Sequence, residues 1–204
     1  MRAILNFGRF HLTDPMAGAY SANRDINSKI RTNILVASLD ELNLYSTANG
    51  LCYGQGLLEV LVVGLGPQYD QTWTMRPKSI FTTLTRCRKL HTIIGDIRLD
   101  RLEKANEQAF ISCDELRNVR LRDIVKSLDI SGAPLLSFDS VAFMVDNAKN
   151  TEAISIKVHP DVYAKLTGDT SNAAAAALSA DELAQWQALV AQAAEKQITF
   201  ATTS

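Results

Sequence analysis

The sequence predicts an α+β fold with a central, mostly antiparallel sheet, flanking helices and a long N-terminal loop or arm. Helix-like and strand-like apolar patterns both occur along the chain. Two alternating apolar runs, at 141–145 and 154–158, are separated by a polar stretch of the length found in hairpins. Residues 13–33 are polar, and their apolar residues do not recur at helix or strand spacing; such a long stretch is unusual inside a compact domain. We expect one domain over residues 1–204, because chains of this length commonly fold as one unit.

Strands and a helix are expected in the N-terminal part. Apolar alternation predicts a first strand over 2–7, and a nearly continuous apolar run predicts a strand over 57–63 that is buried on both faces. Between them, apolar residues recur at helical spacing from Leu35 to Tyr45, so we expect a helix that ends near Gly50. Ser38 and Glu41 have capping-box spacing, which makes Ser38 an alternative start. Residues 13–33 are interpreted as a binding loop, an arm that reaches a neighbour, or a partly disordered segment.

The middle of the chain is expected to be mainly helical. Apolar residues at helical spacing over 80–91 predict one helix. Mixed charges at close spacing over 98–109 predict a second, solvated helix. Ser112 and Glu115 have the spacing of a capping box, which predicts a third helix whose buried stripe reaches Leu128. No internal repeat of useful length is apparent.

A hairpin and a short helix are expected next. The runs 141–145 and 154–158 alternate apolar and polar residues, and we expect them to pair as antiparallel strands. Pro160 suits the first turn of a helix, and Gly168 suits its end.

The C-terminal part contains the clearest helix pattern. Residues 180–196 form an amphipathic stripe, and Ser179 with Glu182 supplies another capping-box spacing. The Ala-rich residues 169–179 are either a linker or the start of that helix. Residues 198–204 are uncharged and β-prone, so they could add an edge strand to this subunit or to a neighbour.

Composition and cysteine usage predict a soluble, cytoplasmic protein with no membrane partner. Hydrophobic residues make up 47% and charged residues 21% of the chain, as in ordinary globular proteins. No apolar run approaches the roughly 20 residues needed to cross a bilayer, and the N-terminus lacks the pattern of a signal peptide. Cys52, Cys87 and Cys113 form no CxxC pair, which is typical of buried thiols in a reducing compartment.

No pattern establishes a catalytic, cofactor or metal site. Cys87 and His91 lie four apart on a predicted helix and could share a metal, but nothing selects two further ligands. Gly64 and Gly66 follow a predicted strand, but Pro67 removes a backbone donor and no P-loop lysine is present. We therefore predict no cofactor and favour a non-enzymatic function, with an enzyme of unrecognised site as an alternative.

Charge is distributed unevenly, and this observation carries the functional prediction. Residues 76–126 contain 12 basic and 7 acidic residues, whereas 127–204 contain 4 and 9. A basic segment of this kind indicates contact with the phosphate backbone of RNA or DNA, here single-stranded and with little sequence preference. The predicted nucleic-acid-binding residues are Arg76, Lys78, Arg86, Arg88, Lys89, Arg98, Arg101, Arg117, Arg120 and Lys126.

Self-association is the second functional prediction. The loop 13–33, the uncharged tail 198–204 and an acidic third that could complement the basic middle are devices by which copies of one chain interlock. The chain would then be a structural subunit of a filament, tube or particle. This hypothesis holds with or without nucleic acid.

Overall fold

The part of the chain that the structure describes forms two sheets, and every strand pair there is parallel. The computed structural model describes residues 4–6, 34–37, 58–63, 77, 79–81 and 84–202. The larger sheet consists, in order, of β1 (Ile4–Asn6), β2 (Ile34–Ala37), β3 (Val60–Val63), β4 (Thr92–Arg98) and β6 (Asn118–Arg122). The smaller consists of β5 (Glu107–Gln108), β7 (Leu128–Asp129), β8 (Ile154–Val158) and β9 (Ile198–Thr202).

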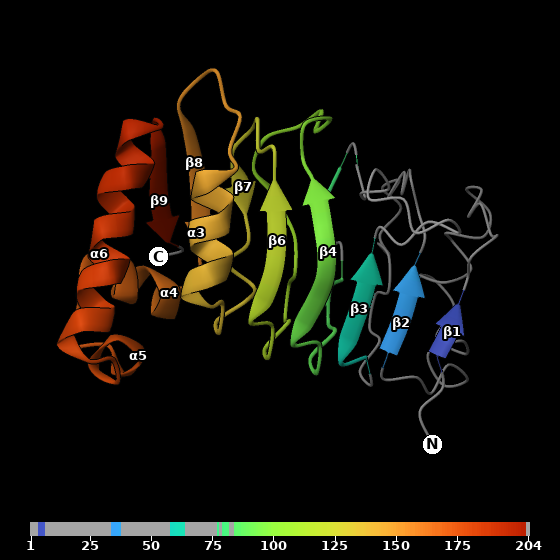
Figure 1. Cartoon of the computed structure of the whole chain (residues 1–204), viewed down its shortest axis with the longest axis horizontal. Helices are drawn as coiled ribbons and strands as arrows, with labels where there is room; N and C mark the ends of the chain where they lie inside the picture. Colours follow the sequence, from blue (N-terminus) through green and yellow to red (C-terminus); the bar gives the residue numbers. More distant parts are fainter. Residues whose placement is uncertain are drawn as a thin grey trace.

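Four helices accompany the strands in the C-terminal part of the chain. They are α3 (Phe138–Asp146), α4 (Pro160–Thr167), α5 (Ala173–Ala176) and α6 (Ala180–Glu195). Figure 1 shows the strands of the larger sheet in a row, with α3 beside β6 and α6 at the far end of the molecule. This is an α/β arrangement, so the predicted α+β fold with a mostly antiparallel sheet is wrong. None of the helices in the described part of the chain is long and apolar enough to cross a membrane.

From β4 onward the chain winds back and forth between the two sheets, and each turn of this winding, called a coil below, stacks on the previous one. From β4 the chain passes to β5 in the smaller sheet, returns to β6 in the larger sheet and crosses again to β7. Thr92 pairs with Asn118, so the coil repeats after 26 residues at this point. Stacking of short units, each of which contacts its neighbours, is the organisation of a solenoid.

A sequence repeat accompanies the stacked coils. The pattern C-x-x-L-x-x-[IV] occurs at 87–93 and again at 113–119, and all of its apolar side chains are buried. Backbone conformation repeats with it, because Leu84 and Phe110 have φ angles of 56° and 57°. The expectation that the chain has no useful internal repeat is therefore wrong.

The three helices predicted in the middle of the chain are absent from the described residues. Residues 84–91 form turns that lead into β4, residues 99–109 form turns and the short β5, and β6 and β7 replace the helix expected after residue 112. The buried Cys87, Leu90 and Ile93 are three residues apart, as on a helix, but they fill the interior of a coil. Apolar spacing alone does not separate these two structures.

Helix α3 replaces the predicted strand at 141–145, so the predicted hairpin is also wrong. The Ser137 side chain accepts a hydrogen bond from the Ser140 N–H and caps this helix, which overrides the β-prone residues that follow. Tertiary packing against β6 keeps α3 in place.

Several predicted elements are confirmed. Strand β8 covers the predicted 154–158, and α4 begins at Pro160 and ends at Gly168, whose φ is 72°. A reciprocal capping box between Ser179 and Glu182 starts α6. The β-prone tail forms β9, which pairs with β8 of its own chain.

Strand β2 occupies 34–37, so the helix predicted in this region does not begin at Leu35. Its alternative start at Ser38, the rest of that helix and the predicted loop at 13–33 lie outside the described residues.

Helix α3 closes the edge of β6 through one side chain. The Ser140 hydroxyl accepts a hydrogen bond from the Val119 N–H at 3.0 Å and donates one to the Arg117 carbonyl at 2.9 Å. Ser140 thus replaces two bonds that a further strand would make, and it is itself buried. The strand array of the larger sheet therefore ends at β6.

Candidate binding groove on the open face of the larger sheet

Strands β4 and β6 bury one face and expose the other. Ile93, Ile97, Val119 and Leu121 point into the core and are each at most 2% exposed. The residues between them point outward, because successive side chains of a strand lie on opposite faces. The outward face is where a candidate site occurs.

A bulge at Gly95 shapes this face. Gly95 has a φ of 98°, and a Cβ there would collide with the carbonyl oxygen of Val63 on β3. The pairing of β4 with β6 shifts between Thr92 and Asp96, which identifies the extra length in β4. As a result Ile94, just before the bulge, is 51% exposed although it is large and apolar.

A shallow groove of about 430 Å³ runs between these strands and α3. Residues of β4 and β6, including Ile94 and Asn118, form its floor, and Asp139 and Phe143 of α3 form one wall. The groove therefore combines an apolar surface with an amide and a carboxylate. Its volume lies in the range of ligand sites in general.

Arg120 borders the groove and is the most distinctive group in it. Its guanidinium carbon lies 4.2 Å from the centroid of the Phe143 ring, a cation–π contact. Its Nε lies 2.9 Å from Oδ1 of Asp96, and the side chain is 57% exposed. The aromatic ring and the carboxylate hold the guanidinium in one orientation while leaving it accessible.

Arg120 belongs to a larger ion-pair network at the carboxyl ends of β4 and β6. Asp96 also pairs with Arg122, at 3.1 Å. Ion pairs in the described part of the chain connect Arg98, Arg120, Arg122 and Lys149 with Asp96, Asp100 and Asp123. Arg120 is the member of this network that lies at the groove.

Asp123 anchors this network from inside the coil. Its side chain is 1% exposed and lies 2.6 Å from Nε of Arg98 and 2.9 Å from Nζ of Lys149. Burial alone would raise the pKa of Asp123, but hydrogen bonds from Lys149 and Arg98 and the charges of Arg98 and Arg122 outweigh it and hold the pKa below 3.8. Asp123 therefore stays ionised and orients the arginines around it.

The predicted basic residues do not form one surface. Those within the described part of the chain are Arg86, Arg88, Lys89, Arg98, Arg101, Arg117, Arg120 and Lys126. Arg76 and Lys78 lie outside it. The structure brings Arg98 and Arg120 into one network, but Arg88, Lys89 and Arg117 lie where the strands begin.

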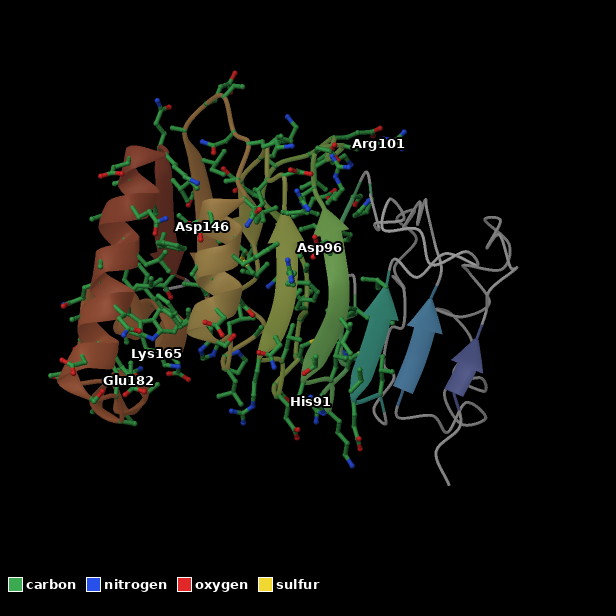
Figure 2. All side chains as sticks on the ribbon, viewed as in Figure 1. His91, Asp96, Arg101, Asp146, Lys165 and Glu182 are labelled. Carbon is green, nitrogen blue, oxygen red and sulfur yellow. The ribbon has the colours of Figure 1, made fainter. Side chains whose placement is uncertain are left out.

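The two ends of the strands are well separated. Figure 2 shows His91 at the end of the molecule where β4 begins and Arg101 at the opposite end. Seven residues of strand span roughly 20 Å, so Lys89 and Arg101 cannot contact the same phosphate.

Basic and acidic residues of neighbouring coils also face each other. Arg88 lies 3.9 Å from Asp114, which occupies the equivalent position 26 residues later, and Asp96 pairs with Arg120 of the following strand. This neutralisation between coils reduces the field that a nucleic acid would meet.

The fold does not support the possible metal pair of Cys87 and His91, which was considered from the sequence and not favoured. Cys87 and His91 do not share a helix, because both lie in the turns before β4. Within the described ranges no group of three or more His, Cys, Asp or Glu residues could hold a metal ion.

The Cys113 thiol is buried in the coil. Burial raises the pKa of this thiol to about 12, and its S–H donates a hydrogen bond to the Leu84 carbonyl at 2.8 Å.

Of the groups that distinguish the groove, only Arg120 was among the residues predicted from the sequence. Ile94, Asn118, Asp139 and Phe143 were missed because each was placed in the wrong element or given no role. The repeated C-x-x-L-x-x-[IV] pattern could have found the first two, because Asn118 precedes and Ile94 follows the buried last residue of a copy, and neighbours of a buried strand residue point outward.

Comparison of the chain with protein-family models, with curated proteins and with solved structures finds no match.

Proposed function

We propose that this chain is a non-enzymatic binding module that holds a polypeptide segment in the groove between β4, β6 and α3. The observation that carries the proposal is Ile94, a large apolar side chain that is 51% exposed beside Phe143 and the ordered guanidinium of Arg120. Open strand faces of stacked coils are the usual binding surfaces of solenoid proteins. Polypeptides supply the mixture of apolar, amide and charged groups that this groove complements.

A peptide-display experiment tests the proposal. A library of random short peptides should yield binders, and Ile94→Asp should abolish their binding because it places an unpaired carboxylate on the floor. Val190→Asp is the matched control, since Val190 is also an exposed apolar residue but lies on α6. Peptides that bind Ile94→Asp as well as the unchanged protein would refute the proposed site.

Contact with a nucleic-acid backbone is the second candidate function. It is supported by the cations at the end where the strands begin, where Arg88, Lys89 and Arg117 are exposed. Burial lowers the pKa of Lys165; the nearby Asp161 carboxylate opposes this shift, and the charge of Arg117 adds to it, so Lys165 and Arg117 are neighbouring cations with Asp161 beside them.

Binding of labelled single-stranded RNA and DNA at increasing salt tests this second function. Replacement of Arg88, Lys89 and Arg117 by glutamine should weaken binding and lower the salt slope by about 0.7 for each phosphate that the variant no longer neutralises. An affinity that is independent of salt, or unchanged in the triple variant, would contradict it.

Self-association is a further proposal from the sequence. One of its supports is weakened, because the uncharged tail forms β9 within its own chain. Another, the segment 13–33, lies outside the described residues. Sedimentation at several concentrations checks this proposal, and a strict monomer would reject it.

A further inference from the structure

The two ends of the groove carry opposite charges. Ser137 donates to Asn118 at 3.3 Å, so the first turn of α3, with Asp139, lies at the Asn118 end. One turn later Phe143 lies against Arg120. The carboxylate of Asp139 and the guanidinium of Arg120 therefore flank the apolar floor provided by Ile94.

The backbone spacing of the residues that line the groove matches that of alternate residues in an extended peptide. Asp139 and Phe143 are one helical turn apart, roughly 6 Å along α3. Asn118 and Arg120 are two residues apart on β6, roughly 6.6 Å. Alternate side chains of an extended peptide point to the same side at roughly the same spacing.

Arg120 retains capacity for an anionic ligand. Within the described residues its Nε pairs with Asp96, but Asp96 also pairs with Arg122, and the Arg120 side chain is 57% exposed. Asp139 is exposed in the first turn of α3. A basic side chain at one end and an acidic side chain at the other would satisfy both.

We propose that the groove selects extended polypeptides in which a basic and an acidic residue alternate, in the order basic-x-acidic or its reverse, with apolar residues flanking them. This inference rests on the proposed function and specifies its ligand. The basic side chain lies against Asp139, the acidic one against Arg120, and the aliphatic portions of both cover Ile94. The edge of β6 is closed by Ser140, so the peptide lies across the face of the sheet and does not extend it.

Charge reversal tests the specificity. The probe is a fluorescein-labelled peptide of sequence Leu-Ser-Lys-Ser-Glu-Ser-Leu, and its affinity is measured by fluorescence anisotropy. Peptides of the same length with Gln-Ser-Gln, Lys-Ser-Lys and Glu-Ser-Glu at the centre serve as controls. The unchanged protein should bind the Lys-Ser-Glu peptide about threefold or more tightly than each control, the gain expected of a partly exposed ion pair.

Two variants should change the preference in opposite directions. Arg120→Glu should bind the Lys-Ser-Lys peptide best, and Asp139→Lys should bind the Glu-Ser-Glu peptide best. Circular dichroism checks that each variant is folded. Because Asp139 is exposed, Asp139→Lys should fold and tests the charge selectivity even if Arg120→Glu unfolds. Unchanged ranking of the peptides in both variants would overturn the charge selectivity.

The control Ile94→Asp separates this inference from the proposed function. Loss of all peptide binding in Ile94→Asp, with unchanged ranking in the charge variants, would refute the selectivity and leave the groove as the binding site. Binding that survives Ile94→Asp would refute both. Preferential binding of single-stranded RNA at the groove, detected by loss in Ile94→Asp, would also overturn the choice of a polypeptide ligand.

Discussion

Replacement of Ser140 by alanine tests how α3 closes the larger sheet. The Ser140 hydroxyl is the partner of the Val119 N–H, whereas the Arg117 carbonyl also accepts a bond from the Ser137 N–H at 2.9 Å. Alanine therefore leaves one buried donor unsatisfied, which costs about 1–3 kcal/mol. The better helix propensity of alanine offsets about 0.5 kcal/mol of this. We expect a net loss of about 0.5–2.5 kcal/mol in the free energy of unfolding.

Urea denaturation followed by circular dichroism measures this loss. The m-value should stay constant and the midpoint should fall, because the change alters stability and not compactness. Gln185→Ala on the exposed side of α6 is the control, and its effect should be within about 0.5 kcal/mol. An unchanged midpoint for Ser140→Ala would refute the assignment of Ser140 as the residue that replaces a neighbouring strand.

Three further predictions concern the coils that support the groove. Gly95→Ala should lower the free energy of unfolding by about 1–3 kcal/mol, measured by urea denaturation, because it adds a Cβ where φ is 98° and the Val63 carbonyl is in the way; a neutral effect would contradict the bulge. The pKa of Asp123 in the folded protein lies below 3.8, so the carboxylate should stabilise the fold fully above that pH, and this stabilisation should be lost as the pH falls through the lowered pKa. Asp123→Asn should therefore make the melting temperature less sensitive to acid. An identical pH profile for the variant would contradict the role given to Asp123. The Cys113 thiol, with its pKa near 12, should resist iodoacetamide at neutral pH until the protein unfolds, as followed by peptide mapping; rapid labelling of folded protein would contradict its burial.

Elements with strong local signals were predictable from the sequence. The capping box of Ser179 and Glu182 and the left-handed Gly168 involve residues that act within one turn, so the sequence pattern is sufficient. The strand β8 was also recognised, because its alternation is regular. Its partners were not recognised, since parallel pairing joins residues that are distant in the sequence.

The middle of the chain was mispredicted for a physical reason. Cys87, Leu90 and Ile93 face the interior of a coil at intervals of three, which imitates one face of a helix. The 26-residue repeat of that pattern contains the missing information, because equivalent residues stack on one another. Ion pairs such as that between Asp96 and Arg120 depend on this stacking, so they cannot be predicted unless the repeat is recognised.

The same limitation affected the candidate site. The basic residues of 76–126 were predicted to act together as one positive surface. The coils instead place them at the two ends of the strands and interleave them with carboxylates. Phe143 was assigned to a strand, so its contact with Arg120 could not be anticipated.

Chemical-shift mapping by nuclear magnetic resonance tests the central claim most directly. On addition of the Leu-Ser-Lys-Ser-Glu-Ser-Leu peptide, the largest backbone amide shifts should occur at 92–96, 118–122 and 138–143, the segments that form the groove. Shifts that are absent there, or that concentrate at Arg88, Lys89 and Arg117, would contradict the groove as the binding site.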